Sequence, residues 1–185
     1  MRASEQVMDD REAIDLCRRG RPEGFRVLFD RYAPFLLTLA TRMLGDRHLA
    51  EDAVQEAFAA AFAGLDGFRG EARVKTWLYT ILYRAALRLR DRRRHELPAA
   101  ELPAVGVAGH APAVEDRLAV REVLDRLPDR DREVLVMAYW DDLTCQEIAE
   151  VMGLTANHVK VLLFRARERF ARSWPAAALE AGAER

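Results

Sequence analysis

The sequence predicts an all-α protein: two small helical domains joined by a flexible linker, the C-terminal one a helix-turn-helix. Apolar residues recur with the period of an α-helix in several segments, and no segment alternates polar and apolar residues over a sustained run. A stretch rich in proline, alanine and glycine, residues 96–113, interrupts this pattern. We therefore expect domains over residues 8–95 and 114–174, with 96–113 as the linker.

Four helices are expected in the first domain. A short helix over residues 9–19 stops at Gly20 and Pro22, and a second begins near Phe25 and closes at Gly45. The third and fourth are expected at about residues 49–63 and 74–94. The second helix is indicated by apolar residues that recur with a strong helical period, at positions 25, 28, 29, 32, 35, 36, 39, 40 and 43.

The second domain contains the pattern of a helix-turn-helix. Helices are expected over residues 114–127 and 128–140. Thr144–Glu147 then forms a capping box, in which the threonine hydroxyl and the glutamate carboxylate satisfy the first free amides of a short helix. Gly153 makes the turn and Thr155 caps the last helix. Its inward side chains are expected to be Val159, Leu163, Ala166 and Phe170.

Charge is segregated along the chain although the formal net charge is only −1. Acidic residues gather over residues 8–56 and 115–150, and basic residues over 69–94 and 160–172. Trp77, Tyr79 and Tyr83 lie among the cations of the first basic segment. Cations interleaved with aromatic residues are typical of a surface that binds nucleic acid. We expect nucleic acid to be one partner of this chain.

A different partner is indicated by the predicted third helix. Asp52, Gln55 and Glu56 fall at i, i+3 and i+4, so one helix face presents two carboxylates and an amide. Small alanine side chains on the neighbouring faces allow close packing behind it. Such a face suits a protein partner rich in arginine, and the alternative is a merely solvated surface.

Enzymatic chemistry is not indicated. The sequence has no GxxxxGK[ST] phosphate loop, no metal-ligand cluster and no recognisable nucleophile–base arrangement, so we expect no cofactor and no metal. Cys17 and Cys145 are isolated cysteines, as in a reducing compartment. No stretch approaches the roughly 20 apolar residues of a membrane helix, and the first residues contain no apolar run. We expect a cytoplasmic protein without membrane insertion.

Two blocks of motifs give the chain a family resemblance. The first contains AEDAVQEAF (50–58), FRG (68–70) and WLYTI (77–81), and the second LPDRDREVLVM (127–137), EIAEVMGL (147–154) and HVKVLLFRAR (158–167). They resemble, in order, regions 2 and 4 of the extracytoplasmic-function (ECF) sigma factors of the sigma-70 family. The resemblance implies an alternative sigma factor that binds core RNA polymerase and directs transcription initiation from a subset of promoters.

The resemblance also implies roles for individual residues. Asp52, Gln55 and Glu56 would contact the β′ clamp helices of the polymerase, whose β flap is a further expected contact. Residues expected to bind the −10 element are Arg69, Arg73, Lys75, Trp77, Tyr79, Arg84 and Arg88. Residues expected to bind the −35 element are Thr155, Asn157, His158, Lys160, Val161, Leu162, Arg165 and Arg167. An anti-sigma factor is a further possible partner.

The chain departs from the family pattern at four of these positions. Arg84 and Arg88 stand where the family usually has Asn and Asp, and Val161 and Leu162 replace a serine and an arginine. These changes leave two alternatives open. One is a sigma-like adaptor or decoy that acts through protein contacts. The other is a stand-alone helix-turn-helix DNA-binding regulator, which would leave the acidic face unexplained.

Overall fold

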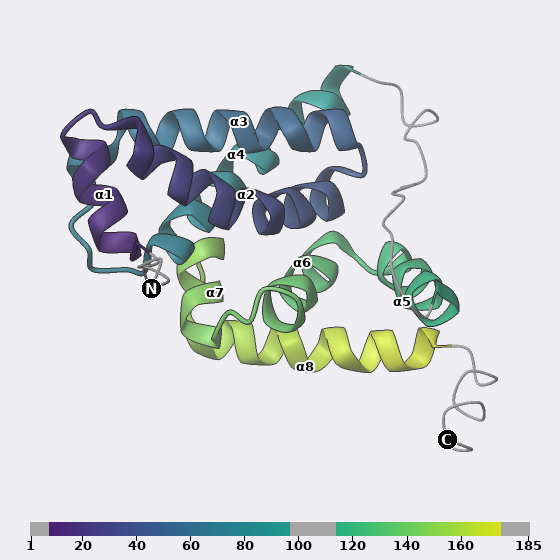
Figure 1. Cartoon of the computed structure of the whole chain (residues 1–185). Helices are drawn as coiled ribbons and strands as arrows, with labels where there is room; N and C mark the ends of the chain where they lie inside the picture. The colour runs from purple at the N-terminus through teal and green to yellow at the C-terminus, as the bar shows by residue number, and fades with distance from the viewer. Residues whose placement is uncertain (1–7, 97–113, 175–185) are drawn as a thin grey trace, which may run out of the picture. The chain divides into compact units, whose positions relative to one another are not determined.

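The computed structural model describes residues 8–96 and 114–174, and both parts are helical (Figure 1). No strand occurs in the described residues, so the predicted all-α class is confirmed. The chain divides into two compact units, with the division between the described parts. Apart from Glu96, the predicted linker lies outside the described residues. We call residues 8–96 unit 1 and residues 114–174 unit 2.

Unit 1 contains four α-helices and a 3-10 turn. These are α1 (Asp10–Arg18), α2 (Pro22–Leu44), α3 (Arg47–Ala63), η1 (Leu65–Gly67) and α4 (Val74–Glu96). Helices α2, α3 and α4 pack against one another, and α1 packs on α2. Asp9 and Glu12 form a capping box at the start of α1, and Asp46 caps α3.

Close contact between α1 and α2 depends on Gly24. A β-carbon at this position would lie 2.3 Å from the carbonyl oxygen of Ala13, so any other residue would push the two helices apart. The C-terminal end of α1 is also held by a hydrogen bond. The Arg18 Nη2 donates to the carbonyl oxygen of Phe68, 2.5 Å away, in the segment after η1. Helix α1 is therefore joined both to α2 and to the segment that leads into α4.

Not every apolar position of α2 is part of the core. Phe25, Phe29 and Phe35 are 40%, 37% and 46% exposed, whereas Leu28, Leu36 and Leu39 of the same helix are buried. Phe25 packs against Phe62 of α3 with ring centroids 4.4 Å apart, and Phe29 against Phe58 at 4.9 Å. Phe25 and Phe29 of α2 thus form an aromatic cluster with Phe58 and Phe62 of α3.

Unit 2 contains α5 (Val114–Arg126), α6 (Asp129–Tyr139), α7 (Cys145–Met152) and α8 (Ala156–Ser173). Helix α8 packs against each of the other three. The predicted capping box at Thr144 and Glu147 is confirmed, and Gly153 adopts the left-handed conformation, with φ +67°, between α7 and α8. This turn sets α8 against α7 in the predicted helix-turn-helix arrangement.

Candidate nucleic-acid and protein interfaces

The acidic face of α3 is exposed. The side chains of Asp52, Gln55 and Glu56 face solvent, while Ala53 and Ala57 on the opposite face are fully buried. Within the described residues neither Asp52 nor Glu56 pairs with a cation. Nearby Glu51, in contrast, is held by Arg47 at 2.8 Å. The face therefore offers two uncompensated carboxylates on a rigid helix, which is an arrangement suited to a basic partner.

The start of α4 is organised by an aromatic contact. The ring of Phe68 packs against the half-buried indole of Trp77, with centroids 4.7 Å apart. The same residue, Phe68, receives the hydrogen bond from Arg18. Arg69 and Arg73 lie exposed on either side of Gly70, which has φ +75°. This segment thus places two guanidinium groups next to an aromatic pair that is partly open to solvent.

Tyr79, one of the residues predicted to bind the −10 element, lies in the core of unit 1 and not on its surface. Its side chain is 0% exposed, and Tyr83 is also buried. Helix α4 packs against both α2 and α3, so its buried stripe is wide enough to enclose these tyrosines. Lys75 lies with its Nζ 5.8 Å from the centroids of the Tyr79 and Phe35 rings. The ammonium group of Lys75 thus lies over the ring of Tyr79, the tyrosine predicted to contact DNA.

Cations remain on the outer surface of α4. Arg84 and Arg88 are exposed and lie four residues apart, hence on one face of the helix. Both stand at positions where the chain departs from the family pattern. Their long charged side chains can contact phosphates, which positions a nucleic acid without reading its sequence.

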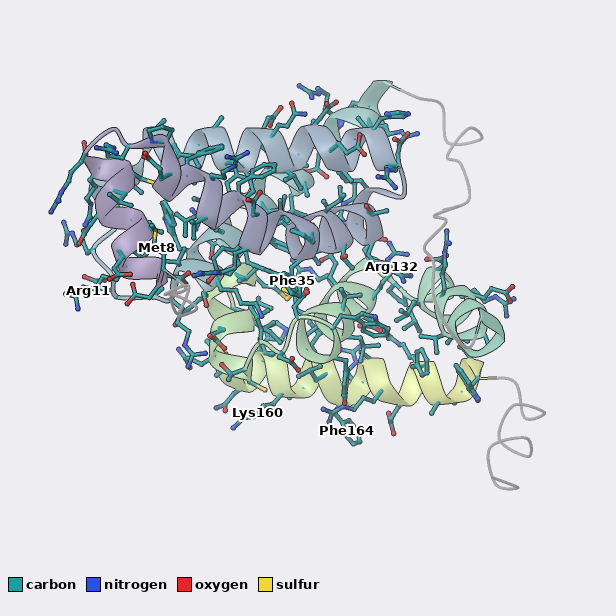
Figure 2. The ribbon with its side chains drawn as sticks, in the orientation of Figure 1. Met8, Arg11, Phe35, Arg132, Lys160 and Phe164 are labelled. Atoms are coloured by element: carbon teal, nitrogen blue, oxygen red, sulfur yellow. The ribbon has the colours of Figure 1, made fainter. Side chains whose placement is uncertain are left out.

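Helix α8 presents most of the residues predicted for it. Asn157, His158, Lys160, Val161 and Arg165 are exposed. The side chains of Lys160 and Phe164 project from the outer side of α8 (Figure 2). Thr155 is also exposed, but its hydroxyl accepts the backbone N–H of His158 at 3.2 Å and so serves as the helix cap.

The expected exposure of Leu162 is wrong. Leu162 is only 8% exposed and lies beside the fully buried Val159 on the inner face of α8. Because α8 packs against α5, α6 and α7, its inner face is broad and includes this leucine. The sequence reading missed Phe164, which is 61% exposed. Its spacing three residues after Val161 could have identified it as an outer residue.

Arg167 is oriented by a neighbouring helix. Its Nε donates to the hydroxyl of Tyr139 at 2.6 Å, and the guanidinium lies 5.5 Å from the centroid of the tyrosine ring. Tyr139 ends α6 and is itself exposed. The contact holds the arginine along the surface of unit 2 and fixes the direction of its positive charge.

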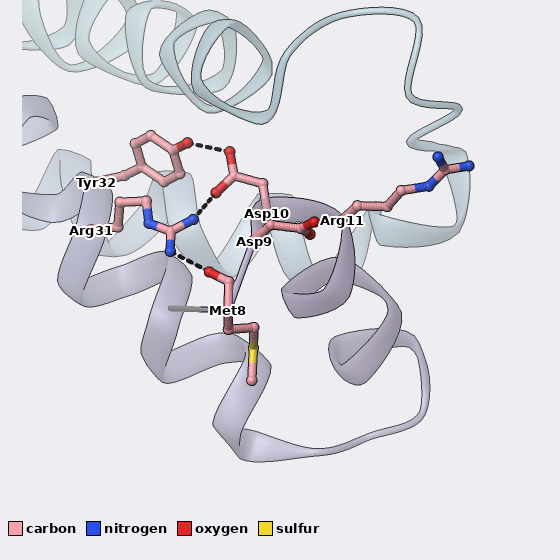
Figure 3. A pocket seen from close by; sticks show the side chains of 6 residues that line it. All are labelled: Met8, Asp9, Asp10, Arg11, Arg31 and Tyr32. Atoms are coloured by element: carbon pink, nitrogen blue, oxygen red, sulfur yellow. Dashed lines mark hydrogen bonds and ion pairs between the residues drawn. The ribbon is translucent and has the colours of Figure 1, made fainter. Parts of the chain in front are cut away.

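A surface depression of unit 1 lies where α1 begins on α2 (Figure 3). Arg31 pairs with Asp10 and donates to the carbonyl oxygen of Met8, and the hydroxyl of Tyr32 donates to Asp10. Burial, together with the hydrogen bond to Asp10, raises the pKa of Tyr32 above its ordinary value, so the phenol stays a donor. These groups satisfy one another and hold α1 in place.

Metal binding and membrane insertion find no support in the part of the chain that the structure describes. No group of three or more His, Cys, Asp or Glu side chains there could hold a metal ion. None of the described helices is long and apolar enough to cross a membrane. Cys17 and Cys145 are half-buried free thiols, and burial raises the pKa of Cys17.

Comparisons with known proteins match both units. The family model described as "Sigma-70 region 2" matches residues 28–96, and "Sigma-70, region 4" matches residues 117–170. The chain is 34% identical to ECF RNA polymerase sigma factor SigM of Mycobacterium tuberculosis over 165 residues, covering 88% of this chain and 83% of SigM. It is 29% identical to ECF RNA polymerase sigma factor SigW of Bacillus subtilis over 173 residues, covering 85% and 92%.

A solved structure gives a similar result. The chain is similar to CnrH, whose structure was determined in complex with the cytosolic domain of CnrY. The TM-score is 0.67 at 26% sequence identity, and the similarity covers 93% of this chain and 97% of CnrH.

Proposed function

The chain belongs to the ECF sigma factors of the sigma-70 family, which are alternative sigma factors that direct transcription initiation. We propose that it directs initiation through three separate surfaces. The acidic face of α3 docks on core RNA polymerase. The α4 side of unit 1 binds and opens the −10 element, and α8 binds the −35 element. This role places the chain in the cytoplasm, where the polymerase acts. It needs no catalytic residue.

Docking on the polymerase rests on the exposed acidic face. The β′ clamp helices implied by the family resemblance would receive Asp52, Gln55 and Glu56, with the β flap as a second contact. The support is that both carboxylates lie exposed on a helix whose other side is packed into the core. This is the single observation that carries the proposal, because a stand-alone DNA-binding regulator has no use for such a face.

Contact with the −10 element rests on cations and one aromatic pair. Arg69, Arg73, Arg84 and Arg88 would meet phosphates, and Lys75 would add charge at the start of α4. Trp77 and Phe68 form the partly exposed aromatic surface on which an unpaired base could stack, worth about 1–3 kcal/mol per base. Tyr79 has no part in this surface because it is buried.

Contact with the −35 element rests on the outer face of α8. In a helix-turn-helix the second helix enters the major groove with its N-terminal residues near the base edges. Asn157, His158, Lys160, Val161 and Arg165 are exposed there. Arg167 would hold the phosphate backbone from the edge of the helix.

An anti-sigma factor is the proposed regulatory partner. The family resemblance implies one, and the similar protein CnrH was determined in complex with the cytosolic domain of another protein, CnrY. A partner that covers α3 or α8 would keep the chain from the polymerase or from DNA.

Run-off transcription with purified core polymerase and a genomic promoter library tests the proposal. The wild-type chain is compared with the Asp52→Arg/Glu56→Arg variant. The control is Asp30→Arg/Glu122→Arg, which makes the same change in net charge at exposed positions outside α3. We expect specific transcripts with the wild type and the control, and their loss with the α3 variant.

The other outcomes point to the alternatives. Core binding by the wild type without any transcript would favour the adaptor or decoy. Duplex binding without core binding would favour the stand-alone regulator. Transcripts that survive the α3 substitutions would contradict docking through the acidic face.

A further inference from the structure

The outer face of α8 carries a narrow apolar ridge. Asn157, Val161, Phe164 and Glu168 follow one another at i, i+4, i+7 and i+11, so they form a single row along the helix. Val161 and Phe164 in the middle of the row are 57% and 61% exposed. These are the two highest values among the large hydrophobic residues that the structure describes.

Cations flank this ridge on both sides. From the helical spacing, Lys160 and Arg167 lie along one edge, and Arg165 lies along the other beside the imidazole of His158. Tyr139 holds Arg167 in its direction by the hydrogen bond and ring contact described above. Glu168, which pairs with Arg172 at 3.9 Å, ends the row with a negative charge. The apolar part is therefore one side chain wide, bordered by positive charge.

This arrangement fits the major groove of a duplex. The groove admits an α-helix, its walls are phosphates, and the methyl group of thymine is its apolar feature. A ridge pointing at the floor of the groove would meet methyl groups while the flanking cations reach phosphates on either side. An apolar protein interface has a core depleted of charged residues, and cations border both sides of this ridge. The glutamate at its end would be repelled by phosphates and marks where the DNA contact stops.

We propose that Val161 and Phe164 read thymine methyl groups on neighbouring base pairs of the −35 element. The proposal rests on the proposed function, because it assumes that α8 binds that element. The two residues are separated by a rise of about 4.5 Å, close to the roughly 3.4 Å between bases of one strand. Val161 takes the place of the usual serine, so the methyl preference is expected to be a property of this chain.

Replacing thymidine by deoxyuridine tests the proposal. The substitution removes only the C5 methyl group and keeps every hydrogen-bonding group of the base. The holoenzyme formed from core polymerase and the full chain is measured on a promoter fragment that it transcribes. Each −35 thymidine is replaced in turn. We expect at least one replacement to weaken binding by about fourfold, the effect of losing one buried methyl group.

Three variants assign the contact to residues. In Val161→Ala and Phe164→Ala, the deoxyuridine replacement opposite the missing side chain should change binding by less than about twofold, since the methyl contact is already lost. Trp140→Ala removes an exposed aromatic residue outside α8 and should keep the full deoxyuridine effect. Thermal unfolding of each variant checks that unit 2 is intact.

The possible failures are distinguishable. If no deoxyuridine replacement affects a holoenzyme that transcribes the unmodified promoter, methyl reading is wrong and the sigma function stands. If Val161→Ala and Phe164→Ala keep the full deoxyuridine effect, other residues read the methyl groups and the proposal is wrong. If no promoter is transcribed at all, the proposed function itself fails, and with it the premise of the proposal.

Discussion

Helices α4 and α8 both carry several Lys and Arg residues among aromatic and apolar ones, but α4 buries most of its large apolar side chains and α8 exposes two of its own. On α4 the residues Tyr79 and Tyr83 are buried, and the exposed positions Arg84 and Arg88 are charged. On α8 the exposed positions include Val161 and Phe164. Under the proposed function, the difference predicts that the body of α4 contacts DNA mainly through phosphates, whereas α8 also reads bases.

Packing explains this difference. Helix α4 lies against both α2 and α3, so its aromatic residues belong to the core of unit 1 and only the outermost row faces solvent. Helix α8 buries smaller side chains, such as Val159, Leu163 and Ala166, against its neighbours. One of its two phenylalanines, Phe164, is left outside, where burial against a partner would be favourable.

The largest expected difference between the aromatic residues of α4 and α8 is in their effect on the free energy of unfolding. Replacing Tyr79 by alanine should destabilise unit 1 by about 3–5 kcal/mol, because it opens a cavity in the core. Replacing Phe164 by alanine should change the stability of unit 2 by no more than about 0.5 kcal/mol, as at other exposed positions. Denaturant unfolding of the full chain measures both. A similar loss for the two variants would contradict the assignment of one aromatic residue to the core and the other to a partner.

Gly24 in unit 1 and Gly153 in unit 2 are needed for different reasons, one for close helix packing and the other for a left-handed turn. Gly24→Ala should destabilise unit 1 by about 1–3 kcal/mol because its β-carbon would collide with the backbone of α1. Gly153→Ala has open space around it and should cost about 1–2 kcal/mol through its left-handed backbone. Asparagine tolerates that conformation, so Gly153→Asn should recover part of the loss, while Gly24→Asn should not. Thermal unfolding distinguishes the two patterns.

Removing the hydrogen bond from Arg18 to Phe68 tests whether the segment before α4 must be held in place for the −10 element to open. Arg18→Ala should slow opening of the −10 element by up to about tenfold, the effect of one hydrogen bond, and leave binding to core polymerase unchanged. Permanganate reactivity of unpaired thymines measures the opening. Arg11→Ala is the control, because Arg11 is exposed on the same helix and points away from the contacts drawn in Figure 3. Equal rates for the two variants would contradict a positioning role.

The salt dependence of promoter binding should show the smallest effect, and it distinguishes a phosphate contact from a base contact. Arg84→Ala should lower the slope of log affinity against log salt by about 0.9, and weaken binding alike on all promoter sequences. Val161→Ala should leave the slope unchanged and alter the preference among −35 sequences. Titration of the holoenzyme with promoter fragments at several salt concentrations measures both. A change of slope for Val161→Ala would place this residue near a phosphate instead of a base.

The elements of the fold were predictable because each is marked locally. Capping residues such as Asp9, Thr144 and Thr155, and glycines such as Gly45 and Gly153, determine where helices begin and end. The family motifs then identify the helix-turn-helix and the acidic face. These signals depend on neighbouring residues only, so the tertiary structure does not alter them.

Burial was predicted less well because it depends on where the neighbouring helices lie along and around a helix. Helical period identifies the direction of an apolar stripe but not its width. On α2, Phe25, Phe29 and Phe35 are exposed although the helix contacts α1, α3 and α4, whereas Tyr79 of α4 and Leu162 of α8 are enclosed. The roles of the exposed site residues stay predictions, and the experiments above address them.

The contacts of α1 show that a boundary drawn by sequence similarity can divide a physical domain. The region 2 match begins at residue 28, inside α2, and leaves out α1 entirely. Yet Gly24 brings α1 against α2, and Arg18 reaches the matched segment at Phe68. A fragment cut at the match would start in mid-helix and lose the support of the segment before α4. An autonomous version of unit 1 should therefore begin no later than Met8, whose carbonyl oxygen Arg31 binds.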